Sequence, residues 1–178
     1  MDLKYPIGKF PGKFGSKTPV DANQRLLDIA AVAEAAAQLR KAVAGLDDRQ
    51  LDTPYRPEGW TVRQVIHHVP DSHINAYIRF RFALTEDSPT VKPYDEAKWA
   101  ELHDAKTMPV EVSLTLLDSL HRRWVDLLGG FSDADFARTL QHPEEGIVRL
   151  DTYLSAYAWH GKHHCAHITG LRERMGWK

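Results

Sequence analysis

The stretch from Asp151 to Met175 constrains the fold of this chain more than any other, because it lacks proline and repeats apolar residues at helical spacing. Such a repeat gathers the apolar side chains on one side of a helix, which then packs against the rest of the protein. We therefore expect one long amphipathic helix over residues 151–175. Its apolar stripe consists of Leu154, Tyr157, Ala158, Cys165, Ile168, Leu171 and Met175.

Four histidines lie in this helix, and two of them face its apolar side. At about 100° per residue, His164 falls about 35° from the centre of the stripe and His160 about 75°, whereas His163 and His167 point further outward. Residues four apart stand one above the other, which lets two imidazoles reach one metal ion. The alternative is a pair of ordinary buried histidines that hydrogen-bond to neighbours. A metal site requires a third ligand from elsewhere in the chain.

Three more amphipathic segments precede this helix. They are expected over residues 22–44, with Asp21 as the N-cap, over residues 61–84, and over residues 113–128. Residues 1–19 combine prolines and glycines with aromatic residues, which predicts an irregular N-terminal arm that is docked by its aromatics.

Residues 85–112 form a long, proline-containing connection between the second and third helices, with a short helix expected around residues 95–102. A connection of this length can cross an entire bundle. The sequence therefore predicts an all-α fold, a four-helix bundle with a long crossover between helices two and three. The chain is long enough for one sizeable core, so we expect a single domain over residues 1–178.

The second helix also carries histidines. On the same angular count, His68 can turn inward and His67 should face solvent. His73 falls within the buried stripe, where a core imidazole hydrogen-bonded to a neighbour is the plainer interpretation.

An internal similarity links the entrances of the second and fourth helices. The segment that begins at Gly45 resembles the segment that begins at Gly130: each has a capped turn and a Pro-Glu loop before a histidine-bearing helix. If two helical hairpins are related by a pseudo-twofold axis, His68 meets His160 and His164 near one end of the bundle. The alternative is a chance similarity between two capped helix starts.

Three neutral histidines hold Zn²⁺ or Ni²⁺ while leaving coordination positions open, which is typical of a catalytic site. A structural zinc site normally has four protein ligands, often cysteines, and Cys165 is interpreted as a small core residue. Motifs of zinc peptidases, phosphate-binding loops and serine hydrolases are absent from the sequence.

The charges limit the classes of partner. With 23 basic and 24 acidic residues and no basic block, the chain lacks the electrostatic footprint for nucleic acid or an anionic membrane. Its one cysteine is compatible with a reducing compartment, and no apolar stretch has the length of a membrane span. We expect a cytoplasmic protein that acts on a small molecule.

Two segments, Gly59–His68 (GWTVRQVIHH) and Trp159–His164 (WHGKHH), resemble the metal motifs of the DinB superfamily. Further similarity, at Tyr5–Gly8 and near the C-terminus among other places, is to its YfiT-like branch of metal-dependent hydrolases and bacillithiol transferases. This resemblance implies a homodimer of four-helix bundles. It also implies one divalent metal ion, Zn²⁺ or Ni²⁺, held by His68, His160 and His164, with His167 as a polar non-ligand.

The resemblance leaves the reaction open. One hypothesis is a hydrolase that uses metal-activated water. A second is an S-transferase that activates a low-molecular-weight thiol, of the bacillithiol type, on the same metal. A third is a non-enzymatic metal-binding module of a stress response. The aromatics Tyr94, Trp99 and Trp177, which the bundle pattern does not bury, are candidates for the dimer contact.

Overall fold

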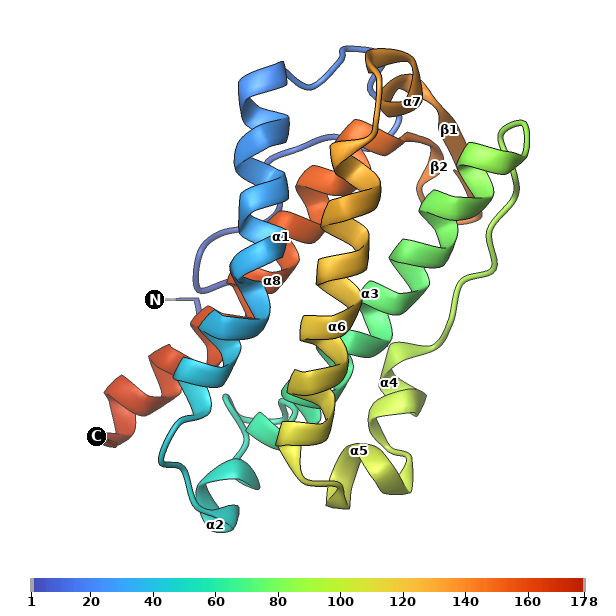
Figure 1. Cartoon of the computed structure of the whole chain (residues 1–178). Coiled ribbons are helices and arrows are strands. Elements are labelled where there is room, and N and C mark those ends of the chain that lie inside the picture. The colour runs from blue at the N-terminus through green and yellow to red at the C-terminus, as the bar shows by residue number, and fades with distance from the viewer. Residues whose placement is uncertain (1, 178) are drawn as a thin grey trace.

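The four long amphipathic segments form the four long helices of the computed structural model, which describes residues 2–177 (Figure 1). They are α1 (Ala22–Val43), α3 (Val62–Thr85), α6 (Val110–Gly129) and α8 (Leu150–Met175). Helix α1 packs against α6 and α8, and α3 packs against the same two. The predicted all-α four-helix bundle is confirmed.

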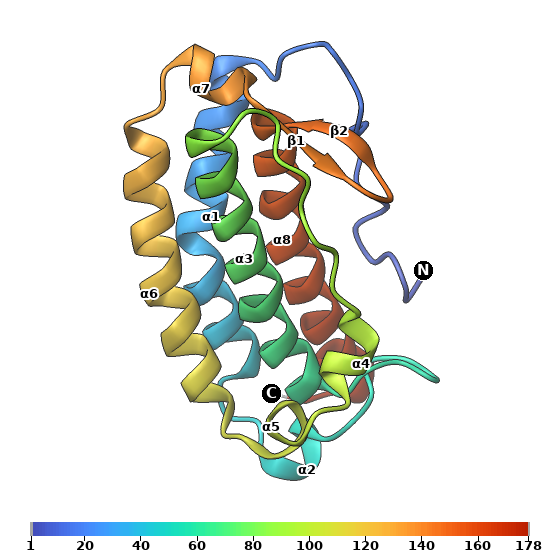
Figure 2. The same cartoon turned by 90° about the vertical axis from the view of Figure 1, so that its right-hand side faces the viewer.

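Helices α3 and α6 are neighbours in the bundle and run in the same direction, so the chain between them must return along the full length of the bundle (Figure 2). This return is the predicted crossover. It contains α4 (Glu96–Ala100), which corresponds to the expected short helix, and α5 (His103–Thr107), which the sequence pattern did not indicate.

Side chains that accept backbone hydrogen bonds set most of the helix starts. Asp21 caps α1, and capping boxes begin α2 (Asp48–Leu51), α3 and α7 (Asp133–Ala137). Helix α6 begins at Val110, three residues before the predicted start, with Pro109 as its N-cap. A helix start tolerates proline because the N–H that proline lacks would have no intrahelical partner there.

A two-stranded hairpin precedes α8, where the sequence predicted only a capped turn and a loop. Strands β1 (Thr139–His142) and β2 (Gly146–Arg149) pair antiparallel, and Leu140 lies opposite Val148 on the buried side. The crossover joins this hairpin, since Val91 donates its N–H to the carbonyl of Gln141. Strands of four residues are too short for an alternating pattern to be recognised from the sequence.

A layer of histidines divides the interior of the bundle. The apolar cluster near the hairpin includes Phe80, Trp124 and Leu154, and the cluster at the opposite end includes Leu39 and Ile66. Between them along α3, α6 and α8 lie the inward-facing histidines His68, His73, His121, His160 and His164. Burying so many imidazoles is costly unless each has a partner, so this layer identifies a specialised site.

The N-terminal arm lies along α8 without regular secondary structure, as predicted. Its aromatic rings dock it: Tyr5 packs against His163, and Phe10 packs against Trp159. Within residues 2–177, no helix combines the length and apolar character needed to cross a membrane.

Candidate metal centre

The start of α3 positions the first histidine of the site. Thr61 accepts a hydrogen bond from the N–H of Gln64, and the Gln64 side chain accepts one from the N–H of Thr61. Gln64 also donates to the carbonyl of Ala100 at 2.8 Å, which ties the crossover to the helix. His68 follows one turn later and packs against Trp60, with 4.7 Å between ring centroids.

Helix α8 supplies the other two histidines from successive turns of one face. Between them, Gly161 faces α1: a Cβ atom at this position would lie 3.1 Å from the Cβ of Ala35. The missing side chain lets α1 and α8 approach closely. His160 and His164 therefore sit on a helix that packing holds in place from behind.

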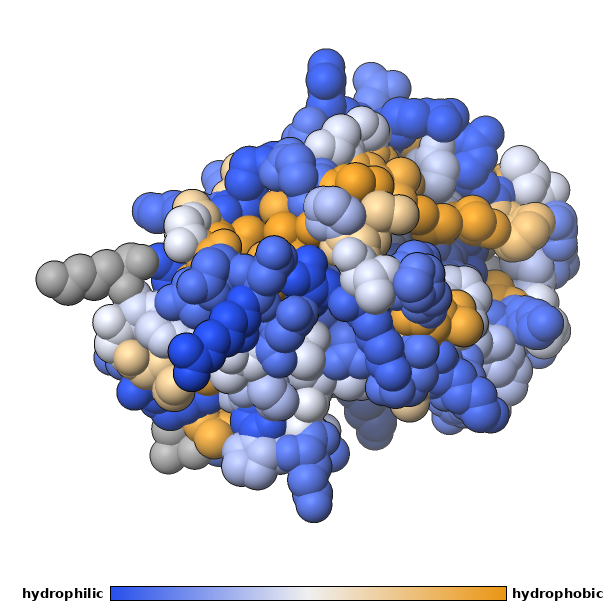
Figure 3. Space-filling model, turned by 90° about the horizontal axis from the view of Figure 1, so that it is seen from below, coloured by the Kyte–Doolittle hydropathy of each residue, from blue (hydrophilic) through white to orange (hydrophobic). Residues whose placement is uncertain are grey.

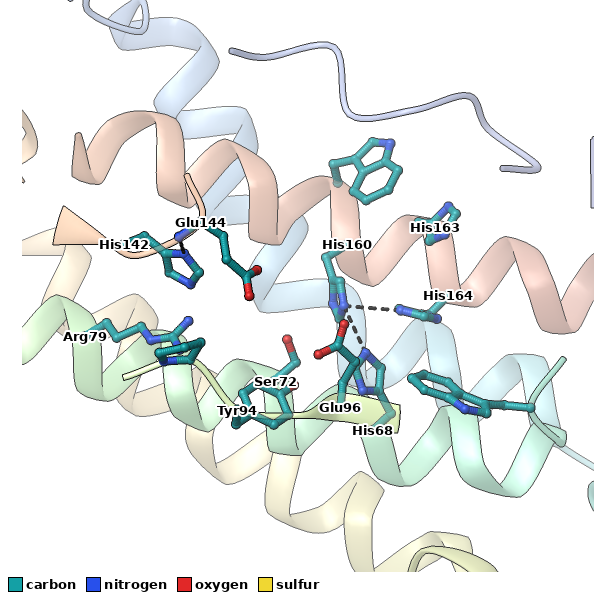
Figure 4. A pocket seen from close by; sticks show the side chains of 13 residues that line it. His68, Ser72, Arg79, Tyr94, Glu96, His142, Glu144, His160, His163 and His164 are labelled. Carbon is teal, nitrogen blue, oxygen red and sulfur yellow. Dashed lines mark hydrogen bonds between the residues drawn. The ribbon is translucent and has the colours of Figure 1, made fainter. Parts of the chain in front are cut away.

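The three histidines His68, His160 and His164, called here the three-histidine cluster, aim their Nε2 atoms at one point (Figure 4). Nε2 of His160 lies 3.2 Å from Nε2 of His68 and 3.2 Å from Nε2 of His164. The ligand atoms of all three lie within 4.8 Å of one another. The sequence-predicted convergence of α3 and α8 at these residues is thus present.

A carbonyl group behind the cluster determines which nitrogen of His164 carries the proton. The carbonyl oxygen of Lys4 lies 3.1 Å from Nε2 of His167 and can only accept, so that nitrogen carries the proton. Nδ1 of the neutral His167 ring then accepts from Nδ1 of His164, at 3.4 Å. Nε2 of His164 is left with its lone pair directed at the centre of the cluster.

A second chain of imidazoles lies behind His160. Nδ1 of His160 is 3.1 Å from Nε2 of His73, and Nδ1 of His73 is 2.8 Å from Nε2 of His121. When Nδ1 of His160 donates along this chain, Nε2 of His160 also presents a lone pair to the cluster. His73 is therefore a buried, hydrogen-bonded imidazole, as predicted, and it supports a member of the cluster.

The residues fit a divalent cation. Lone pairs on nitrogens 3.2 Å apart repel each other unless a proton or a cation lies between them. Burial lowers the pKa of His68 to about 4, and burial together with the neighbouring imidazoles lowers the pKa of His160 and His164 well below the ordinary value. All three rings are neutral at pH 7, which is the form that binds Zn²⁺ or Ni²⁺.

The open side of the cluster faces a cavity of about 370 Å³. Its wall combines residues of α3, the crossover, the hairpin and α8, so it exists only in the assembled fold (Figure 4). The lining residues are Trp60, His68, Ser72, Arg79, Pro93, Tyr94, Glu96, His142, Glu144, Trp159, His160, His163 and His164.

Three histidines that the angular count turned away from the apolar stripes are buried, and this corrects the count: His67, His163 and His167. His67 is covered by the start of α6 and the residues just before it: its ring nitrogens lie 2.7 Å from Oγ of Ser113 and 3.0 Å from the carbonyl oxygen of Met108. His163 is covered by the N-terminal arm and stacks on Trp159, with 4.4 Å between the ring centroids. An angular count around one helix does not include segments that fold over its outer face.

Several cavity residues were not predicted from the sequence. Arg79 lies eleven residues after His68, a spacing that returns to the same helix face. Its position beside the cavity could therefore have been predicted from the helical spacing. His142 and Glu144 come from the hairpin, and Glu96 comes from the crossover; nothing in the sequence indicated that these segments meet the cluster.

Comparisons with known proteins agree with this fold. The family model of the DinB superfamily matches residues 31–168. Proteins of Bacillus mycoides (strain KBAB4) and Bacillus cereus (strain B4264), each named "Putative metal-dependent hydrolase", are 53% identical to this chain over 178 residues, with 99% of each chain covered.

Similar solved structures include the following two. YfiT from Bacillus subtilis, described as a probable metal-dependent hydrolase with an unusual four-helix bundle topology, is 46% identical, with a TM-score of 0.95 and 100% of both chains covered. TT2238, a four-helix bundle protein, is 21% identical, with a TM-score of 0.52 over 86% of this chain and 98% of that one. The second similarity concerns the fold alone.

Proposed function

Because this chain belongs to the DinB superfamily, we propose that it is a metal-dependent hydrolase whose ion is held by His68, His160 and His164. The observation that carries the proposal is the convergence of three neutral Nε2 atoms at the end of an open cavity. The names of the relatives from Bacillus support the same class of activity.

One ion per chain, Zn²⁺ or Ni²⁺, matches the donor set, since both ions accept imidazole ligands. Such an ion supplies Lewis acidity that lowers the pKa of water at its open coordination position. Three protein ligands leave that position free, whereas a structural zinc site normally uses four.

The remaining roles belong to side chains of the cavity. Among the described residues, Glu96 and Glu144 are the carboxylates that line it, so they are the available acceptors for a proton released during hydrolysis. Trp60 and Trp159 contribute apolar surface to the cavity wall. A cavity of this size favours a small-molecule substrate.

The first test is metal content. In His68→Ala, His160→Ala and His164→Ala, loss of one of three ligands should leave purified protein largely metal-free by elemental analysis, against one ion per chain in the unmodified protein. His67→Ala is the matched control, because it removes a buried imidazole that does not point at the cluster. Full occupancy in His68→Ala would contradict the assignment.

The second test is turnover. Metal-loaded protein should hydrolyse members of an ester and amide panel, and the three alanine variants should lose this activity. A parallel assay offers a low-molecular-weight thiol with a chromogenic electrophile. Thiol consumption without hydrolysis would favour an S-transferase, and inactivity in both assays at full metal occupancy would favour a non-enzymatic metal-binding module.

A further inference from the structure

A buried arginine lies at the far end of the cavity from the three-histidine cluster. Arg79 is 6% exposed and lines the cavity from α3. Its guanidinium donates to the hydroxyl of Tyr153 at 2.7 Å and to the carbonyl of Lys92 at 2.7 Å. Both partners are neutral groups, so they hold the guanidinium in place without balancing its charge.

No carboxylate among residues 2–177 forms an ion pair with Arg79. The other arginine buried to this degree, Arg63, pairs with Asp48 and Asp52 at 2.8 Å and 2.6 Å. A buried charge is costly unless it is paired. The missing partner of Arg79 is therefore expected to come from outside the chain.

Helix geometry relates Arg79 to the cluster. Eleven residues after His68, it returns to within about 20° of the same helix face, about 16 Å further along the axis. Ser72 lies on this face between them and also lines the cavity. One molecule in the cavity can therefore contact both ends.

His142 lies at the same end of the cavity as Arg79 (Figure 4). Burial and the charge of Arg79 lower its pKa, so its ring is neutral at pH 7. Nδ1 of His142 accepts from the N–H of Glu144 at 3.4 Å, which leaves the proton on Nε2 as a second donor at this end. The carboxylates Glu96 and Glu144 are exposed residues of the cavity wall.

We propose that the substrate carries an anionic group, a carboxylate, that binds Arg79 and His142 while its reacting bond lies at the three-histidine cluster. This inference rests on the proposed hydrolase function and adds its substrate class: a carboxylate-bearing molecule long enough to span the cavity. A guanidinium fork fits a carboxylate because it offers parallel N–H donors.

The first experiment uses metal-free protein, so it does not depend on the metal. Binding of hexanoate is compared with binding of hexanol by ligand-observed NMR. We expect hexanoate to bind about 10-fold more tightly than hexanol, as for a charge-assisted hydrogen-bonded pair. Equal binding of the two in the unmodified protein would overturn the proposal.

The second experiment tests whether one molecule can span from the three-histidine cluster to Arg79. Cobalt-loaded protein is titrated with mercaptopropionate, mercaptohexanoate and mercaptoundecanoate and with the matching mercapto alcohols, and the thiolate-to-cobalt absorption reports binding. Only acids long enough to reach Arg79 should bind more tightly than their alcohols, by about 10-fold. A preference at every length, or at none, would overturn the spanning arrangement.

Substitutions at position 79 test whether Arg79 causes the preference for carboxylates. Arg79→Gln should abolish the preference for carboxylates in both experiments, and Arg79→Lys should retain part of it, since the charge remains without the fork. Arg81→Gln removes the same charge from an exposed position two residues away and should keep the preference. Retention of the full preference in Arg79→Gln would overturn the proposal.

The experiments distinguish failure of the proposed metal centre from failure of the proposed carboxylate-binding site. Protein that binds no cobalt contradicts the proposed metal centre, while the metal-free comparison still decides the anion site. Protein that binds cobalt and thiols without a carboxylate preference contradicts the anion site alone.

Discussion

His73 makes no contact with the cavity, yet it is expected to control metal affinity through His160. Its Nε2 lies 3.1 Å from Nδ1 of His160 and its Nδ1 lies 2.8 Å from Nε2 of His121. Replacing it with phenylalanine removes the acceptor that orients His160. His73→Phe should weaken metal affinity about 10- to 100-fold, measured by competition with a chelator of known affinity.

The control for this prediction is His67→Phe, which replaces another buried imidazole on the same helix that contacts Met108 and Ser113. It should lower stability without a comparable loss of metal affinity. Equal losses in the two variants would mean that His73 acts only through the packing of the helix.

At the scale of elements, the contact between α1 and α8 sets the position of the cluster. A Cβ atom at Gly161 would meet the Cβ of Ala35 at 3.1 Å. In Gly161→Val the branched side chain must push the helices apart, which should lower the free energy of unfolding by about 1–3 kcal/mol in urea denaturation. Metal affinity should fall too, because His160 and His164 flank this contact.

Gly170→Val is the matched control on the same helix. A Cβ atom there would meet only the guanidinium of Arg174, at an ordinary 3.5 Å, and that side chain can move. Its stability and metal affinity should stay close to those of the unmodified protein. Losses as large as those of Gly161→Val would show that any valine in α8 has the same effect.

At the scale of the whole molecule, the histidine layer should make the metal-free protein unstable in acid. The pKa values of His68 and His121 are lowered by burial to about 4, from the ordinary 6.5. Between these values the unfolded chain binds more protons than the folded one. The free energy of unfolding therefore rises with pH between about 4 and 6.5. Each histidine whose pKa is lowered to about 4 contributes about 1.4 kcal/mol per pH unit to this rise, and its contribution disappears as the pH falls toward 4.

One group opposes this trend. Burial and the charge of Asp104 raise the pKa of Asp71 to about 6, so this carboxyl favours the folded state at lower pH. The histidines with lowered pKa outnumber it, and the net slope remains positive. Denaturant titrations in the presence of a chelator, at several pH values, measure how the free energy of unfolding changes with pH. His121→Phe should reduce the number of protons taken up on unfolding by about one. Stability that is independent of pH between 4 and 7 would contradict this account.

Homodimerisation stays a prediction for the whole molecule. Tyr94 is half-buried in the cavity wall and Trp177 packs on the apolar cluster near α2, so of the three proposed contact aromatics only Trp99, 39% exposed, remains at the surface. The end of the bundle that carries α2 and α5 shows apolar side chains within a mostly hydrophilic surface (Figure 3). We expect light scattering to give twice the mass of the chain; a monomer would remove the prediction.

Local sequence patterns were enough to predict the four long helices and the metal-ligand candidates that α3 and α8 contribute. Apolar periodicity is a local property: without knowledge of the fold it directed His160 and His164 inward and allowed His68 to turn inward. The internal similarity between two helix entrances then brought α3 and α8 together. Both inferences use residues that are close in sequence or related by a repeat.

The surroundings of the cluster, in contrast, follow from the packing of segments that are far apart in the chain. His67 and His163 are buried because the start of α6 and the N-terminal arm fold over faces that the angular count left to solvent. Arg79 and His142 meet across a cavity whose wall comes from a helix and a hairpin far apart in the sequence. Such contacts depend on how elements pack in three dimensions, and no local pattern of residues encodes that packing.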